Sequence, residues 1–225
     1  MITQQFQGDK KVGASLLHRP EKRFIAWALP HVPARIRSHH LTLASIPISI
    51  LIIVFSYLAH QHIGWLWAVS VLITFQWLTD SLDGAVGRAR GEGLVRWGYY
   101  MDHFLDYIFL ASILIGYMLL LPDHYKYMHF FILAILSAFM VNSYLSFAAT
   151  NEFRISYWGI GPTEVRLIFI LINTFLIILK KTYIAGSLPW ILGASFIGLC
   201  VVIYRTQKRI WKIDMENKKS QSLPE

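Results

Sequence analysis

The chain has 225 residues, of which 55% are hydrophobic, and its mean hydropathy of +0.46 argues against an ordinary soluble domain. A single cysteine, Cys200, excludes a disulfide framework. The net charge of +8 comes from basic residues that flank apolar segments, which favours anionic membrane lipids as partners and no nucleic acid.

A polar, basic leader covers residues 1–40 and lacks the apolar stretch of a cleavable signal peptide. Within it, residues 19–36 are too few and too polar to span a membrane. Phe24 and Trp27 can share one apolar face there, with Lys22 outside it. This pattern predicts an amphipathic helix lying on the cytoplasmic membrane interface, with an ordinary structured leader as the alternative.

Six apolar segments follow the leader, and all but the fifth reach the length that a membrane-spanning helix needs. The sequence therefore predicts an all-α integral membrane protein, with six transmembrane helices plus the N-terminal amphipathic interfacial helix. One domain, 1–225, would hold the leader, a six-helix bundle at 41–205 and a cytoplasmic tail at 206–225, which we expect to be disordered after Trp211. The expected spans are residues 41–60, 65–82, 99–121, 127–149, 164–179 and 184–204.

Basic residues set the orientation of these spans. All but three of the 21 Lys and Arg residues fall in the termini or in the loops after spans two and four. The exceptions are Lys126, Lys180 and Lys181. Because positive residues accumulate on the inner side, we expect both termini and the loop after span two in the cytoplasm.

Four aspartates lie where spans two and three approach this cytoplasmic loop. Asp80 and Asp83 are three residues apart, and Asp102 and Asp106 are four apart, so each pair shares one face of a helix. Four carboxylates on adjacent helices cannot all stay ionised unless cations lie among them, and oxygen ligands favour Mg²⁺, Mn²⁺ or Ca²⁺. The alternative is a set of solvated loop charges, paired with Arg88, Arg90 and Arg96.

Small residues and one arginine stand beside these acids. Gly84, Gly87 and Gly98 leave room for close approach by a backbone or a ligand. Arg88 lies one turn beyond Gly84 and can make bidentate contacts to phosphate oxygens. Together with divalent ions, this set favours a diphosphate substrate.

The pattern resembles the signature of the CDP-alcohol phosphotransferase (CDP-alcohol phosphatidyltransferase) family, D-x-x-D-G-x-x-A-R-x8-G-x3-D-x3-D. Seven of its eight fixed positions match. Gly87 replaces the signature alanine, and the spacer after Arg88 has nine residues instead of eight. The matching residues are Asp80, Asp83, Gly84, Arg88, Gly98, Asp102 and Asp106.

The resemblance implies an enzyme of phospholipid biosynthesis that moves a substituted phosphate from a CDP-linked alcohol to an acceptor alcohol and releases CMP. It implies that Asp80, Asp83 and Asp102 hold one or two ions of Mg²⁺ or Mn²⁺, with two expected, and that Asp106 contacts metal or acts as general base. It also implies that the glycines and Arg88 bind the nucleotide and the diphosphate. The expected setting is the bacterial inner membrane, with the site facing the cytoplasm, and the family suggests a homodimer.

Three further residues are candidates for a substrate pocket. His39 and Thr42 open span one, where they could contact the nucleotide, or serve as an interfacial histidine and a helix cap. Arg166 enters span five, where it could bind a phosphate or headgroup in the acceptor pocket, or pair with Glu164.

Two other functions use intramembrane acids. A cation transporter would spread them through the membrane depth, whereas here they cluster at one end. An intramembrane prenyltransferase also binds diphosphates through Asp-rich motifs, but these differ from the pattern here. The sequence leaves open whether the lipid is the donor, as CDP-diacylglycerol, or the acceptor.

Overall fold

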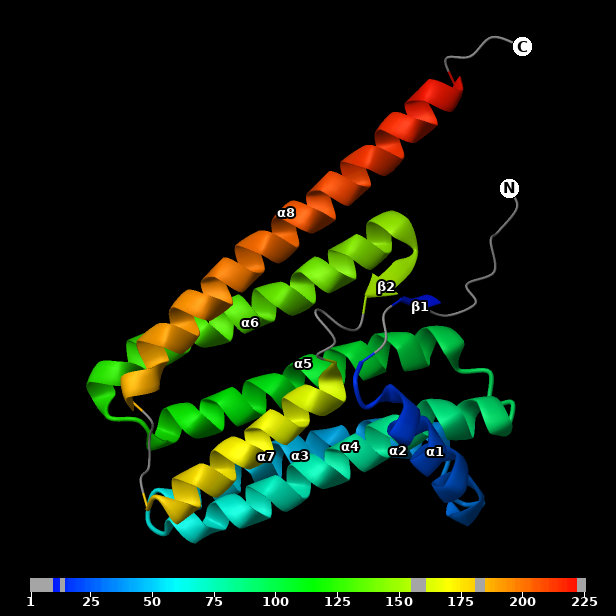
Figure 1. Cartoon of the computed structure of the whole chain (residues 1–225). Helices are drawn as coiled ribbons and strands as arrows, with labels where there is room; N and C mark the ends of the chain where they lie inside the picture. The colour runs from blue at the N-terminus through cyan, green and yellow to red at the C-terminus, as the bar shows by residue number, and fades with distance from the viewer. Residues whose placement is uncertain (1–9, 13–14, 155–160, 181–184, 222–225) are drawn as a thin grey trace.

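The computed structural model describes residues 10–12, 15–154, 161–180 and 185–221, and helices make up most of them (Figure 1). The elements in chain order are β1 (Lys10–Val12), α1 (His18–Ala28), η1 (Leu29–His31), α2 (Ser38–Leu43), α3 (Ser45–Ala59), η2 (Ile63–Trp65), α4 (Leu66–Ala89), α5 (Val95–Leu120), α6 (Asp123–Thr150), β2 (Glu152–Arg154), α7 (Pro162–Ile178), η3 (Ala185–Ser187) and α8 (Leu188–Gln221).

The six predicted apolar segments are helical where they are described; Ile184, the expected start of the sixth, lies outside the described residues. Four helical segments are long and apolar enough to cross a membrane, which agrees with an integral membrane protein. They are Ser38–Ala59, Val95–Leu120, Asp123–Thr150 and Leu188–Lys218. Helix α7 has only 17 residues and α4 carries several polar ones, so six crossings remain a prediction.

Helices α3, α4, α5 and α7 share the main core, and α6 packs against α8 beside them (Figure 1). Ile52, Leu66, Ile73 and Ile113 are at most 1% exposed at the centre of this core. Because lipid tails are as apolar as these side chains, close packing has to hold the helices together. Gly116 permits such packing: a Cβ there would lie 2.4 Å from the Ser56 hydroxyl oxygen of α3.

The leader docks on the bundle near the C-terminal end of α4 and the N-terminal end of α7. The Phe24 ring packs 5.3 Å from the Trp77 ring of α4. Glu21 accepts hydrogen bonds from the Ser81 hydroxyl of α4 and the Thr163 hydroxyl of α7, both at 3.1 Å. Helix α1 of the leader ends at Ala28, before the end of the predicted stretch 19–36, because prolines follow it. Its position at a membrane interface remains a prediction.

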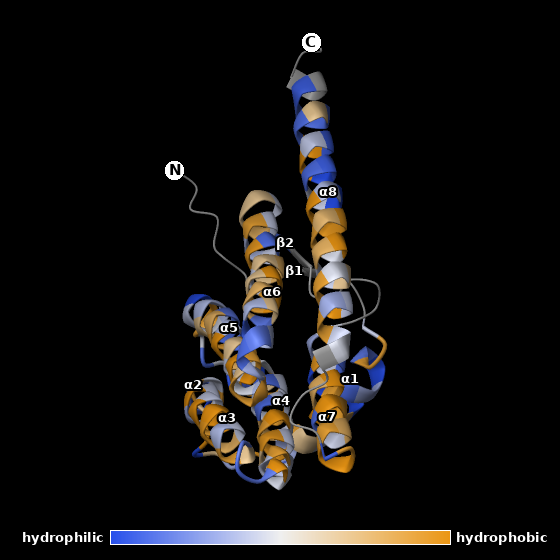
Figure 2. Ribbon diagram, turned by 90° about the vertical axis from the view of Figure 1, so that its left-hand side faces the viewer, coloured by the Kyte–Doolittle hydropathy of each residue, from blue (hydrophilic) through white to orange (hydrophobic). Residues whose placement is uncertain are grey.

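The all-α fold class is confirmed among the described residues, where β1 and β2 add only a short two-stranded parallel sheet. One expectation is wrong in detail. The segment after Trp211 was expected to be disordered, yet α8 runs on to Gln221 and extends beyond the other helices (Figure 2). Good helix formers and an i,i+4 pair between Lys212 and Glu216 (3.6 Å) explain this extension.

Candidate active site

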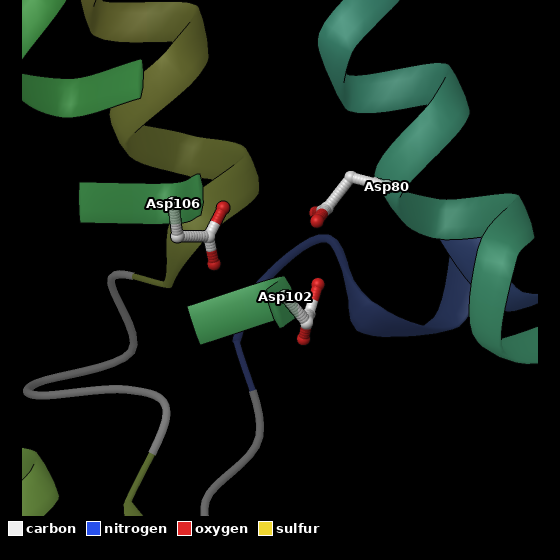
Figure 3. A group of neighbouring side chains, drawn as sticks. All are labelled: Asp80, Asp102 and Asp106. Carbon is white, nitrogen blue, oxygen red and sulfur yellow. The ribbon is translucent and has the colours of Figure 1, made fainter. Parts of the chain in front are cut away.

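Three of the four predicted aspartates converge between α4 and α5. One carboxylate oxygen each from Asp80, Asp102 and Asp106 lies within 4.8 Å of the other two. Asp80 projects from α4, and the other two project from successive turns of α5 (Figure 3). We call these three residues the acid triad. All three are partly buried, so the sequence places a concentrated negative charge at the edge of an apolar bundle.

The turn between α4 and α5 creates this convergence. Helix α4 ends at Ala89 and α5 begins at Val95, so the nine-residue spacer is divided between helix ends and a short turn. Gly91 and Gly93 have φ of +62° and +70°, the left-handed conformation that glycine adopts without strain. Arg90 anchors the turn to the leader by donating to the Ile36, Val32 and Pro33 carbonyls.

Asp83 is held by other partners. Its Oδ2 accepts a hydrogen bond of 2.8 Å from the buried Thr42 hydroxyl of α2, and its Oδ1 accepts one from the Gly84 N–H. Asp83 is therefore tied to α2, and it is not a member of the acid triad.

Arg166 joins the acids from a third helix, α7. Its Nη2 donates to Asp80 Oδ2 at 2.9 Å and to Asp106 Oδ1 at 3.2 Å. Its Nε donates to Gln76 Oε1 at 2.7 Å, and the guanidinium carbon lies 5.5 Å from the Phe109 ring centre. Arg166 is 5% exposed and therefore supplies a buried positive charge beside the acid triad.

Neither reading of Arg166 from the sequence describes these contacts. The Glu164 carboxylate instead accepts hydrogen bonds from the Leu17 N–H at 2.8 Å and the Gly161 N–H at 2.9 Å. On its other side, Arg166 borders an apolar cavity of about 360 Å³ between α1, α4 and α7, with Phe24 and Trp77 in its wall.

Gly84, Gly87 and Arg88 lie in the last turns of α4, and Gly98 lies in the first turn of α5. A Cβ at Gly84 would lie 3.1 Å from Arg88 Nη1, so the exposed guanidinium crosses directly over this glycine. A Cβ at Gly87 would touch Ser38 at 3.4 Å, in ordinary contact. Gly98 faces open space, with no atom within 4 Å of an added Cβ among the described residues.

His39 lies one helical turn before Leu43 on α2, where its ring packs 4.1 Å from that of His40. The His40 Nδ1 accepts a hydrogen bond from the Arg37 N–H and so contributes to the start of the helix.

Two residues at the site were not predicted. Gln76 is 1% exposed and holds Arg166; its polar side chain four residues before Asp80, inside an apolar span, was an available signal. His103 places Nδ1 3.2 Å from Asp102 Oδ2, and the Tyr144 hydroxyl donates to the His103 carbonyl at 2.7 Å. The histidine follows Asp102 directly, but its contact with α6 depends on the fold.

The sequence model of the CDP-alcohol phosphatidyltransferase family matches residues 36–202, which include the acid triad, Asp83, Arg88 and Arg166. No curated protein matches the chain.

Proposed function

The chain belongs to the CDP-alcohol phosphatidyltransferase family, and on this premise we propose that it transfers a substituted phosphate from a CDP-linked alcohol to an acceptor alcohol and releases CMP. Membership implies the donor, the acceptor and transferase activity. The observation that supports this chemistry best is the convergence of Asp80, Asp102 and Asp106 from two helices beside the glycines and Arg88.

The residues suit a divalent cation. The triad offers oxygen ligands alone, from three carboxylates whose charges need neutralising, and hard ions such as Mg²⁺ and Mn²⁺ prefer such ligands. We assign the triad to one or two of these ions, with Asp83 as a further ligand that Thr42 orients. Bound there, the ions would neutralise the diphosphate and stabilise the leaving CMP.

The protein's own residues would do the rest. Arg88, lying over Gly84, would bind the diphosphate, while the space at Gly98 and the smallness of Gly87 would admit the nucleotide. Asp106 would accept the proton of the acceptor hydroxyl as its oxygen attacks the β-phosphorus and the bond from that phosphorus to the CMP oxygen breaks. Of the two triad acids on α5, Asp106 lies farther from the start of the helix, which supports this role.

We further propose that α2 with α3, and α4 to α8, cross the bacterial inner membrane six times, as one domain with both termini and the site in the cytoplasm. The interfacial α1 would then lie beside the site, where a membrane lipid and a water-soluble partner can meet. Pairing of two chains into a homodimer is part of this proposal on family grounds.

Purified protein in detergent, given Mg²⁺, a CDP-alcohol and candidate acceptors, should release CMP, and EDTA should stop the reaction. Labelled CDP-diacylglycerol and labelled small CDP-alcohols, tested separately, would show which side of the reaction carries the lipid. Asp106→Asn should lose turnover and keep its melting temperature in detergent. Turnover of prenyl diphosphates without CMP release, or cation flux in vesicles, would overturn the proposal.

A further inference from the structure

Arg166 is a buried cation whose donors are directed to the acid triad and its surroundings. At 5% exposure its charge is largely shielded from water. Its Nε donates a hydrogen bond of 2.7 Å to Gln76 Oε1, which fixes the guanidinium. The same Nη2 reaches Asp80 on α4 and Asp106 on α5, so one group from α7 joins the two helices that make the site.

Arg166 contacts only one oxygen of each of these two carboxylates. Arg166 Nη2 meets Oδ2 of Asp80 and Oδ1 of Asp106, and each of these side chains has a second oxygen. The guanidinium can therefore hold both carboxylates in one rotamer while their other oxygens remain available to a ligand. Fixing the ligating groups in this way is what outer partners do in metal sites.

We propose that Arg166 is the positioning residue of the acid triad: it stands in for a cation between Asp80 and Asp106 and holds Asp106 in the orientation that proton transfer needs. This inference rests on the proposed function, because it requires a divalent ion at the triad. It assigns Arg166 to the acids instead of to a substrate phosphate.

Removing the Arg166 charge should strengthen metal-ion binding but lower turnover. A positive charge next to a divalent ion weakens ion binding, so its removal strengthens the attraction of the acids for the ion. The same removal frees Asp106 to rotate, which costs turnover because a general base must stay within hydrogen-bond reach of its proton. A merely structural arginine would lower the amount of folded protein and leave the metal dependence of that protein unchanged.

The test uses Arg166→Met, which removes the charge, Arg166→Lys, which keeps it, and Asn173→Leu as the control. Asn173 is on the same helix and 0% exposed, and it bonds to Ser70 and Tyr117 without touching the triad. Mn²⁺ binding to each purified protein is measured by electron paramagnetic resonance, and CMP release is measured as kcat and KM across Mg²⁺ and CDP-alcohol concentrations.

We expect Arg166→Met to bind Mn²⁺ about ten-fold more tightly and to lose about 100-fold in kcat. Arg166→Lys should keep the wild-type Mn²⁺ affinity and recover part of the kcat, and Asn173→Leu should change neither per folded molecule. If the methionine variant does not fold, the lysine variant decides the matter alone: a raised KM for the CDP-alcohol with unchanged kcat would make Arg166 a substrate ligand and overturn the proposal.

The two proposals fail differently. If the wild type binds no Mn²⁺, the metal-dependent function is wrong, and this inference fails with it. If the wild type binds Mn²⁺ and Arg166→Met binds it equally or more weakly, only the role of Arg166 is wrong.

Discussion

The hydroxyl of Thr42 donates to Asp83 Oδ2 across 2.8 Å and so joins α2 to the acidic end of α4. The Thr42 hydroxyl oxygen also lies 3.1 Å from the Ser38 carbonyl oxygen. Since a hydroxyl has a single proton and a carboxylate is the stronger acceptor, the bond to Asp83 dominates. Thr42 is 5% exposed, so little water can replace it.

Thr42→Val keeps the shape of the side chain and removes this donor. A hydrogen bond to a charged group contributes about 1.5–3 kcal/mol, so we expect CMP release to fall roughly ten-fold or more and the Mg²⁺ requirement to rise. The measurement is kcat/KM across a Mg²⁺ titration. Thr174→Val is the matched control, because its hydroxyl donates only to the Ile170 carbonyl of its own helix among the contacts described. Equal activity of the two variants would contradict a role for Thr42.

Asp80→Asn and Asp102→Asn each remove one charge from the acid triad and keep its size. One carboxylate oxygen from each member of the acid triad lies within 4.8 Å of the other two. We therefore expect either change to weaken Mn²⁺ binding by at least about ten-fold and to abolish CMP release at millimolar Mg²⁺. Asp123→Asn is the control, an aspartate at the start of α6 whose partner is Lys126 at 2.7 Å. Wild-type Mn²⁺ affinity in both triad variants would rule out a metal centre here.

The helices and the two acid pairs could be predicted from the sequence because the signals are local. Apolar runs of membrane length specify helices, and spacings of three and four residues put Asp80 with Asp83, and Asp102 with Asp106, on shared helix faces. Local spacing could not decide which acids would meet. The structure groups Asp80 with the α5 pair and gives Asp83 to Thr42.

The contacts of Arg166 could not be predicted from the sequence for a related reason. Gln76 and Arg166 are 90 residues apart in the chain, and they meet only because α7 packs against α4. The pairing of Glu164 with the leader at Leu17 spans 147 residues and likewise depends on the assembled bundle. The sequence offered an ion pair between Glu164 and Arg166 only as one alternative to a phosphate or headgroup contact.

Gly98→Ala separates stability from function. Replacing a helical glycine with alanine stabilises a helix by up to about 1 kcal/mol, and an added Cβ at this site meets no described atom within 4 Å. If that space admits the nucleotide, the methyl group should raise KM for the CDP-alcohol several-fold while the melting temperature stays level or rises. For comparison, Gly91→Ala should lower the melting temperature, because its φ of +62° strains any other residue. An unchanged KM in Gly98→Ala would remove this residue from the binding site.

Glu92 gives the turn between α4 and α5 a pH dependence. Its Oε2 accepts hydrogen bonds from the Ser38 hydroxyl at 2.8 Å and the Ser38 N–H at 3.0 Å, which caps α2. The hydroxyl bond is the main reason that the pKa of Glu92 lies below its ordinary value of 4.5, and the nearby Arg37 charge adds to it. A lowered pKa means that the ionised form is stabilised in the folded protein. That contribution is complete above pH 4.5 and is lost as pH falls through the lowered pKa.

Glu92→Gln removes this charge and keeps a neutral amide of the same size. We therefore expect the variant to melt below the wild type at pH 7, by an amount that stays constant above pH 4.5 and shrinks as pH falls through the lowered pKa and wild-type Glu92 becomes protonated. Melting temperatures in detergent across this range measure the difference. Glu216→Gln serves as the control, since this exposed glutamate pairs with Lys212 at 3.6 Å on the extension of α8, away from the turn. A difference between Glu92→Gln and the wild type that does not shrink at any pH below 4.5 at which the protein still folds would show that the charge of Glu92 does not hold α2.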